Sequence, residues 1–186
     1  MEPPTVVLDA CVIYPMPLCD TLLRVAENGF YRLRFSQKIL DEVTRNLINK
    51  KGKSLKVAER FETQIKACFP EALVNVPEWR VQQMTNDPKD RHVLATAVQS
   101  QAQLIITTNL KDFSQQALTP WGIQAQHPDT FLTYLWDDND HLKAELVQLL
   151  TEQSQQLSKP PISFKQLLQK LEKQVPNFVS RVENWS

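Results

Sequence analysis

Oxygen-bearing side chains follow two apolar runs of the sequence at the points where strands would end. Asp9 comes directly after the run 5–8, and Asn109 and Asp112 come shortly after the run 104–107. Open parallel sheets place their ligand crevice at the carboxyl ends of the strands, so these side chains are expected at one edge. Carboxylate and amide oxygens are ligands for hard divalent cations, which promote attack on phosphate esters.

Glu42 is a third candidate, because it stands at the border of an apolar helix face. The predicted helix 36–49 is capped by Ser36, and its periodic apolar residues face inward. Asn46 lies one turn after Glu42 and would share its contacts, whereas Asp41 points outward. Glu42 is therefore positioned to reach a site beside the sheet.

Asp90 is the fourth candidate, and its position in a predicted helix turns it inward. Asp87 is expected to be the N-cap and Pro88 the first helical residue, which places Asp90 at the third helical position. Val93 follows Asp90 at helical spacing and belongs to the apolar face. A carboxylate on that face is costly to bury unless it is paired, hydrogen-bonded or bound to metal.

Each position also has a purely structural explanation. Asp9 and the segment 109–112 would serve as cap or turn residues, and Glu42 as a surface residue. Asp90 would complete a capping box, and His92 is explained by packing as well as by acid–base chemistry. The joint occurrence of four such segments favours a shared site, because the sequence has no glycine-rich phosphate loop, HExxH motif or nucleophile elbow.

Alternating strand-like and helical segments predict an α/β fold for the first two thirds of the chain. Strands separated by helices imply right-handed crossovers and a covered parallel sheet. The segment 30–35 is compatible with either a strand or a loop. The predicted strands are 5–8, 73–76, 104–107 and 123–126, and the predicted helices are 17–27, 36–49 and 54–68.

The sequence after residue 127 changes character and predicts helices alone. Helices are expected at 129–136, 140–157 and 163–174, with a break at 158–161. The predicted division is therefore a domain over residues 1–127 and a helical extension over 128–186. The extension is expected to pack on the preceding domain through apolar residues. These are Phe131, Leu132, Leu135, Leu146 and Leu149.

Composition indicates an ordinary globular chain without a membrane segment. Hydrophobic residues make up 42% of the 186 residues and charged residues 23%, and no secretory signal precedes the first strand, so the cytoplasm is expected. The three cysteines, Cys11, Cys19 and Cys68, predict neither a disulfide framework nor a zinc site.

Positive charge is concentrated locally, although Lys plus Arg equals Asp plus Glu at 21 each. Seven bases stand against two acids between Arg45 and Lys66. Such a run is often a solvated helix face, but beside an acidic site it would hold a phosphate backbone. The candidate phosphate-binding residues are Arg45, Lys50, Lys51, Lys53, Arg91 and Lys111.

The four acidic segments together resemble the PIN-domain family, and in particular the VapC-type toxin ribonucleases of bacterial toxin–antitoxin systems. The resemblance covers approximately residues 5–127 and implies a three-layer α/β/α domain with a central, mainly parallel sheet, here followed by a C-terminal helical extension. The family often has Asn two residues after the first Asp, where this chain has Cys11. The matching segments are Val-Leu-Asp at 7–9, Leu-Asp-Glu-Val-Thr-Arg-Asn-Leu at 40–47, Asp-Pro-Lys-Asp-Arg-His-Val-Leu-Ala at 87–95 and Ile-Thr-Thr-Asn-Leu-Lys-Asp-Phe at 106–113.

The resemblance implies a catalytic acidic site formed by Asp9, Glu42, Asp90 and an oxygen ligand supplied by Asn109 or Asp112. Metal ligands are expected from Asp9, Glu42, Asp90 and Asp112, and hard oxygen donors favour Mg²⁺ or Mn²⁺ over zinc. The implied partners are an RNA substrate, a cognate antitoxin protein and a second copy of the chain in a homodimer.

Three functions are compatible with these residues. The first is a metal-dependent endoribonuclease, the toxin component of a type II toxin–antitoxin system. The second is a non-catalytic PIN scaffold that binds RNA or a protein partner. The third is a metal-dependent phosphatase of small molecules, which would hydrolyse nucleotides rather than polymers. Metal-dependent RNA cleavage, compared with RNA binding without metal, distinguishes the first from the second.

Overall fold

The computed structural model describes residues 2–138 and 140–185, which form two compact units. The first unit contains the chain up to Tyr14 together with Tyr31–Gln126, and the second contains Pro15–Phe30 together with the chain from His127 onward. The C-terminal helices therefore share a unit with a segment from the N-terminal part of the chain. The sequence boundary between residues 127 and 128 stays a prediction.

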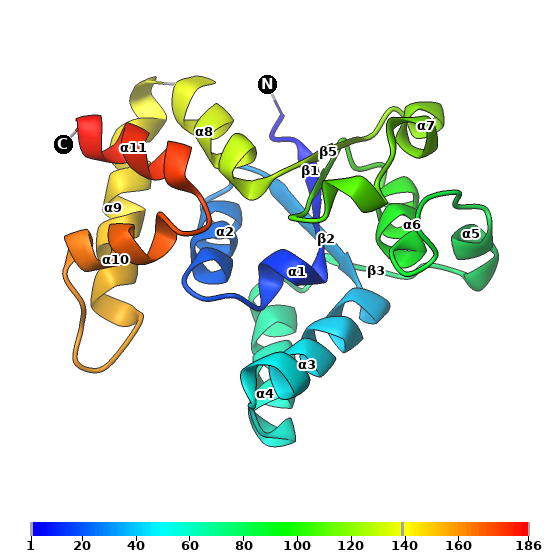
Figure 1. Cartoon of the computed structure of the whole chain (residues 1–186), viewed down its shortest axis with the longest axis horizontal. Helices are drawn as coiled ribbons and strands as arrows, with labels where there is room; N and C mark the ends of the chain where they lie inside the picture. The colour runs from blue at the N-terminus through cyan, green and yellow to red at the C-terminus, as the bar shows by residue number, and fades with distance from the viewer. Residues whose placement is uncertain (1, 139, 186) are drawn as a thin grey trace. The chain divides into compact units, whose positions relative to one another are not determined.

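A five-stranded, all-parallel sheet is the centre of the first unit (Figure 1). The strand order is β3-β2-β1-β4-β5. Flanking helices complete the α/β architecture, which confirms the predicted fold class. The strands are β1 (Thr5–Leu8), β2 (Arg32–Ser36), β3 (Leu73–Val74), β4 (Leu104–Ile106) and β5 (Gln124–Gln126).

The segment that the sequence left open between strand and loop forms β2. Leu33 and Phe35 are buried while Arg32 is exposed, and Val6 of β1 stands opposite Leu33 in the parallel register. Pairing with the fully buried β1 fixes this segment as a strand. Local sequence could not decide this, because the deciding partner is about thirty residues away.

The connections of the sheet reverse direction beside β1. The chain moves from β1 to β2 and β3 on one side, then returns to place β4 on the other side of β1. Val7 of β1 pairs with Ile105 of β4, so the carboxyl ends of these two strands are neighbours. Such a switch point is where open parallel sheets bind their ligands.

Helices and short helical turns connect the strands of the first unit. The long helix α3 (Gln37–Lys51) buries Ile39, Leu40, Val43 and Leu47 and ends at Gly52, whose φ of 62° is a left-handed conformation that glycine adopts without strain. The other helices are α1 (Ala10–Ile13), α4 (Leu55–Cys68), α5 (Glu78–Gln82), α6 (Arg91–Gln99) and α7 (Gln115–Leu118), with 3-10 turns η1 (Leu110–Asp112) and η2 (Thr119–Trp121).

The predicted start of α6 is wrong by three residues. Asp90, rather than Asp87, is the N-cap residue, and the helix begins at Arg91. Asp87 instead organises the preceding turn, because its Oδ1 accepts the Lys89 N–H and its carbonyl accepts the Asp90 N–H. The i to i+3 bond closes a turn that does not continue as α-helix. Asp90 is nevertheless buried, as its place on the inward face predicted.

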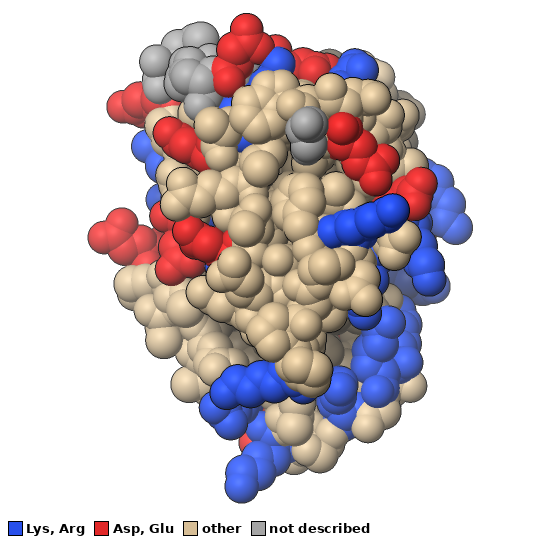
Figure 2. Space-filling model, turned by 90° about the vertical axis from the view of Figure 1, so that its left-hand side faces the viewer, with Lys and Arg blue, Asp and Glu red and all other residues tan. Residues whose placement is uncertain are grey.

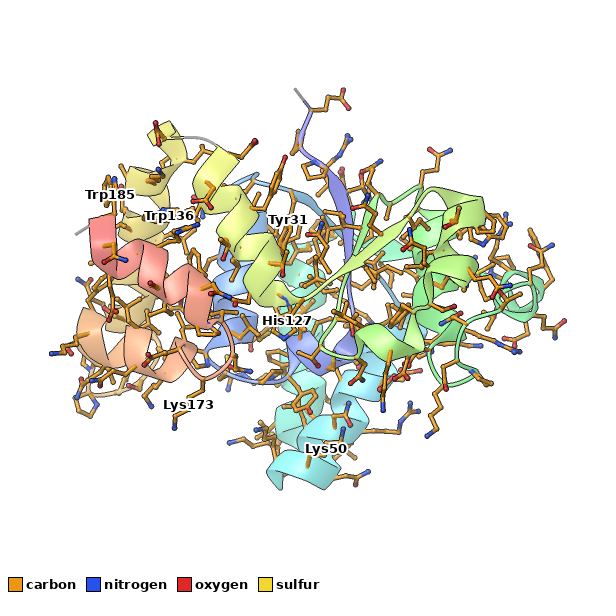
Figure 3. All side chains as sticks on the ribbon, turned by 45° about the horizontal axis from the view of Figure 1, so that its top comes forward. Tyr31, Lys50, His127, Trp136, Lys173 and Trp185 are labelled. Carbon is orange, nitrogen blue, oxygen red and sulfur yellow. The ribbon has the colours of Figure 1, made fainter. Side chains whose placement is uncertain are left out.

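Helices joined by turns and loops, without any strand, make up the described residues of the second unit. The five apolar residues through which the extension was expected to pack on the preceding domain are all buried, and that packing stays a prediction. Trp136 makes edge contacts with Phe178 and with Trp185, at ring-centroid distances of 6.2 and 5.8 Å (Figure 3). The helices are α2 (Leu18–Glu27), α8 (Pro128–Asp138), α9 (Asp140–Gln156), α10 (Phe164–Leu171) and α11 (Pro176–Trp185), of which the sequence analysis did not predict α11.

Helix α2 belongs to this unit because it packs on α9. The fully buried side chain of Gln153 joins them: its Oε1 accepts a hydrogen bond from Thr21 Oγ1 (2.9 Å) and its Nε2 donates to the Pro17 carbonyl (3.0 Å). Buried polar groups of this kind need hydrogen-bond partners.

The charged side chains that Figure 2 shows on one face of the molecule are of both signs. Among the described residues no helix is long and apolar enough to cross a membrane.

Asp129 caps the last helix of the unit. It is buried in the first turn of α8, and its carboxylate accepts hydrogen bonds from the backbone N–H of Asn177 and Phe178 and from the Asn177 side chain, at 3.3, 2.9 and 2.7 Å. The two backbone groups belong to the first turn of α11 and have no partner within the helix. A carboxylate at this end also meets the positive pole of the helix dipole.

Replacing Asp129 with Ala is expected to destabilise the protein by about 2–4 kcal/mol, because three bonds to a charged group are lost. Urea titration followed by circular dichroism measures the change. Asp137 is the matched control, since it also joins α8 to α11 but pairs with Arg181 at the surface. Asp137→Ala should cost no more than about 1 kcal/mol. Equal effects of the two substitutions would contradict the capping role.

Candidate active site

The Asp9 carboxylate is held at the switch point by hydrogen bonds to one of its two oxygens. Asp9 is 2% exposed, and its Oδ2 accepts from Thr107 Oγ1 at 2.7 Å and from Cys11 Sγ at 3.1 Å. Its backbone N–H continues the β1–β4 ladder by donating to the Ile106 carbonyl. Burial raises the pKa of Asp9, although both hydrogen bonds act in the opposite direction. No hydrogen bond among the described residues engages Oδ1 of Asp9.

Cys11 connects the ends of β1 and β4. Its thiol donates to Asp9, and its sulfur accepts from the backbone N–H and the hydroxyl of Thr108, at 3.3 and 3.1 Å. Burial and the neighbouring Asp9 raise the pKa of Cys11 to about 12, so the thiol keeps its proton and remains a donor. Cys11 thus orients the first carboxylate, at the position where the family that the sequence resembles often has Asn.

Glu42 reaches the site from α3 and contacts His92. Glu42 Oε2 lies 3.2 Å from His92 Nε2, and the two side chains are 28% and 13% exposed. The contact falls short of hydrogen-bond geometry, since Nε2 has no hydrogen-bond partner among the described residues. The neighbouring imidazole, opposed by partial burial, lowers the pKa of Glu42, and the charges of Arg45 and Lys50 act in the same direction. Glu42 is therefore an anion at neutral pH.

Asp90 lies where the other carboxylates converge. It is 7% exposed at the start of α6. Burial, followed in order by the charges of Asp9, Asp112 and Glu42, raises its pKa to about 7. Four carboxylates from four separate segments thus share one region. The negative charges repel one another, and a bound cation would reduce this repulsion.

The segment 109–112 contributes Asp112 more clearly than Asn109. Asp112 is half-buried, its charge acts on Asp90, and its carbonyl accepts the Asp87 N–H at 3.3 Å. Asn109 is exposed, and its backbone N–H donates to Thr107 Oγ1 at 2.9 Å. The turn therefore directs Asp112 towards the cluster, while Asn109 stabilises the turn itself.

The candidate phosphate-binding residues lie on the segments that carry the acids. Arg45 and Lys50 follow Glu42 on α3, and both charges act on Glu42. Arg91 is the residue after Asp90, and its Nε donates to the Asn86 carbonyl at 3.4 Å. The remaining three, Lys51, Lys53 and Lys111, are exposed.

Sequence reasoning did not single out Thr107, which is central to the geometry. Thr107 is fully buried, donates to Asp9 and accepts the Asn109 N–H, so it connects the first carboxylate to the turn that carries Asp112. The available signal was its position: it directly follows β4, which pairs with the strand that ends at Asp9. A hydroxyl there faces the carboxylate across the switch point.

The donor set fits a divalent metal in its chemistry. The four carboxylates supply hard oxygen ligands whose charges repel one another, and such a set suits Mg²⁺ or Mn²⁺. Within residues 2–138 and 140–185, no three His, Cys, Asp or Glu side chains are already arranged to hold an ion. Coordination by several of them therefore requires side-chain movement. Oδ1 of Asp9 has no hydrogen bond among the described residues and Asp112 is half-buried, so these two carboxylates have oxygens available to an ion.

The raised pKa of Asp90 predicts a pH-dependent stability. Its ordinary value is 3.8 and its value in the fold is about 7, so as pH rises between them the unfolded chain releases a proton that the folded chain retains. Stability therefore falls with rising pH in this window. The lowered pKa of Glu42 affects stability only around and below its ordinary value of 4.5, so the trend above about pH 5 is unaffected by it.

We expect the melting temperature in excess chelator to fall as pH rises from about 5 to about 7.5. In Asp90→Asn, which does not titrate, the fall should be smaller, and the remainder reports Asp9, whose pKa is also raised. Differential scanning fluorimetry over this range measures it. A melting temperature that rises with pH in the wild type would contradict the described electrostatics.

A parallel sheet with carboxylates gathered at its switch point defines an α/β protein with an acidic, metal-suited site. Comparison with known families is consistent with this class, because the PIN domain matches residues 5–111. This match covers more than half of the chain, and the chain therefore belongs to the PIN-domain family. The VapC50 C-terminal domain matches residues 128–184, which form most of the second unit.

A curated relative matches about half of the chain. The chain is 41% identical over 98 residues to the protein named "Putative ribonuclease VapC50" from Mycobacterium tuberculosis. The aligned region is 53% of this chain and 56% of the relative, so the match spans about half the length of each protein. No solved structure matches the chain.

Proposed function

We propose that this protein is a metal-dependent endoribonuclease that hydrolyses RNA phosphodiester bonds. The observation that carries the proposal is the convergence of Asp9, Glu42, Asp90 and Asp112, whose charges act on one another at the switch point. The name of the VapC50 relative, a ribonuclease, supports RNA as the substrate. The proposed cofactor is Mg²⁺ or Mn²⁺.

The four carboxylates are the proposed metal ligands. A divalent ion held among them supplies an activated water and stabilises charge that develops at phosphorus. Thr107 and Cys11 bind Oδ2 of Asp9 and so orient its other oxygen for coordination. The proton that Asp90 retains up to a pH near 7 is released when positive charge enters the site. We assign the fourth position to Asp112, with Asn109 supporting its turn.

The neighbouring bases are the proposed contacts to the RNA backbone. The charges of Arg45 and Lys50 act on Glu42, and Arg91 follows Asp90 at the start of α6, so a phosphodiester at the carboxylates would lie within reach of cations from two helices. Such contacts position a nucleic acid without reading its sequence. Lys51, Lys53 and Lys111 would extend the contact at the exposed surface.

We further propose that the protein acts as the toxin of a type II toxin–antitoxin system in the cytoplasm. The support is the family membership, the VapC50 relative and the additional match of residues 128–184 to the VapC50 C-terminal domain. A toxin of this kind requires a cognate antitoxin, and a homodimer is the expected assembly. Co-expression with the product of the adjacent gene, followed by purification of a stable complex that no longer cuts RNA, tests this part.

Cleavage of RNA by the purified full chain tests the nuclease directly. A panel of single-stranded and structured RNAs, including transfer and ribosomal RNA, is incubated with Mg²⁺ or Mn²⁺ and with excess chelator. We expect cleavage with metal and none with chelator, preferentially in loops, where bases are unpaired. If RNA is bound but stays intact with both metals, the non-catalytic scaffold replaces the nuclease, and if only nucleotides are hydrolysed, the small-molecule phosphatase does.

A further inference from the structure

Tyr14 is an aromatic side chain beside the acidic site that the proposed metal chemistry does not use. Helix α1 begins directly after Asp9 and ends at Ile13, so Tyr14 is carried by the same short segment as the first carboxylate. The ring is half-buried. Nζ of Lys50 lies 5.5 Å from the ring centroid and Nζ of Lys51 lies 5.8 Å from it. Both distances are within the range of cation–π attraction.

The two lysines come from the end of the helix that carries Glu42. Figure 3 shows Lys50 at the far end of α3, roughly two turns beyond Glu42. Lys50 is nevertheless near enough to Glu42 for its charge to act on that carboxylate. Lys50 therefore contacts the Tyr14 ring and also acts on the carboxylate that α3 contributes to the cluster.

The end of α3 that contacts Tyr14, together with the chain that follows it, carries only positive charges. The sequence contains no Asp or Glu between Glu42 and Glu59, while five bases lie in this interval. Lys50, Lys51 and Lys53 are exposed. Charge of one sign without local compensation favours a polyanion over a protein surface of mixed charge. The five bases are Arg45, Lys50, Lys51, Lys53 and Lys56.

We infer that Tyr14, Lys50 and Lys51 form a nucleotide-binding subsite for single-stranded RNA, in which an unpaired base stacks on the Tyr14 ring while the lysines bind the flanking phosphates. The inference rests on the proposed function, because the RNA is the substrate of the neighbouring carboxylates. It adds a base contact where the acids and bases alone provide only backbone contacts. Duplex RNA cannot use the subsite, since its bases are already stacked and paired.

Displacement of the lysines from the ring is energetically feasible. A cation–π contact at an exposed site is weaker than a stack between a base and an aromatic ring. Each lysine has a flexible stem, so it exchanges the ring face for a phosphate oxygen without movement of α3. In the free protein the same contacts keep the ring covered and the lysines near the path of the RNA.

Fluorescence anisotropy of a short labelled oligouridylate in excess chelator, which prevents cleavage, tests the subsite. Tyr14→Leu is expected to weaken binding about tenfold, whereas Tyr14→Phe, which keeps the ring, should bind within about twofold of wild type. The dependence of affinity on salt should be unchanged in Tyr14→Leu, because the phosphate contacts remain. Replacing Lys50 and Lys51 with Gln should reduce the salt slope by about 1.4, which is two single-strand phosphate contacts.

Another aromatic residue with a cation near its ring provides the control. Trp79 is 53% exposed and has the Arg80 guanidinium 4.5 Å from its ring centroid, so it resembles Tyr14 in its partner but lies on α5. Trp79→Leu should leave oligouridylate affinity unchanged. Wild type should also bind an abasic analogue about tenfold more weakly than oligouridylate, which tests stacking even if Tyr14→Leu fails to fold.

The outcomes separate this inference from the proposed nuclease. If wild type cleaves RNA in metal while Tyr14→Leu and the abasic analogue bind normally, the stacking subsite is excluded and the nuclease stands. If oligouridylate is bound through Tyr14 but no RNA is cut, the subsite stands without the nuclease. Absence of any binding by wild type, or an equal loss in Trp79→Leu, excludes the subsite.

Discussion

Asp90→Ala is expected to abolish RNA cleavage, with kcat lowered by at least about a thousandfold. Asp90 is the residue on which the charges of the other three carboxylates converge, so its removal takes away both a ligand and the centre of the negative potential. Asp9→Ala should be equally severe, and Glu42→Gln nearly so. Single-turnover cleavage at saturating protein, with Mn²⁺ and Mg²⁺ in separate series, separates this loss from weaker RNA binding.

Two neighbouring carboxylates serve as controls for these substitutions. Asp87 accepts the Lys89 N–H in the turn before α6, and Asp87→Asn preserves that acceptor. Asp41 precedes Glu42 but is exposed and bonds to the Gln37 side chain. Asp87→Asn and Asp41→Asn should cleave at nearly the wild-type rate. Cleavage by Asp90→Ala at the wild-type rate would show that the proposed site is not the active site.

Mg²⁺ or Mn²⁺ is expected to stabilise the folded protein strongly, because the cluster exists only in the native state. At a concentration one hundred times the dissociation constant, the gain in unfolding free energy is about 2.7 kcal/mol. Asp9→Asn should lose this gain while keeping the acceptor for Thr107 and Cys11. Melting curves with metal and with chelator measure both quantities.

The melting curve in chelator distinguishes lost metal binding from damage to the fold. Burial raises the pKa of Asp9, so a neutral amide there relieves a buried charge. Asp9→Asn should therefore melt no lower than wild type in chelator at pH 8, and lower only when metal is present. The same metal-induced shift in wild type and in Asp9→Asn would show that ions stabilise the protein elsewhere.

The sequence was sufficient to predict the strands that carry the site and the acids at their ends. The runs 5–8 and 104–107 are apolar and β-branched, so they are buried strands in any compact α/β fold of this chain. Helical periodicity also placed Glu42 at the edge of the buried face of α3. These features are local, because burial and periodicity follow from neighbouring residues.

Two features of the second unit depend on residues far apart in the sequence, so local sequence patterns could not predict them. The sequence predicted its helices after residue 127, but neither α11 nor the place of α2 among them. Helix α11 is capped by Asp129, which precedes it by nearly fifty residues, and α2 is joined to α9 through Gln153. The cap of α11 and the packing partner of α2 are therefore decided by residues that become neighbours only when the chain folds.

Sequence alone thus determined which residues carry oxygen ligands and that strand ends would bring some of them together. Only the tertiary structure decided how they are held. Cys11, a departure from the family pattern in sequence, donates to Asp9 because β4 brings Thr107 and Thr108 against it. Orientation of a buried carboxylate depends on donors from other strands and helices, and those donors become neighbours only when the sheet has formed.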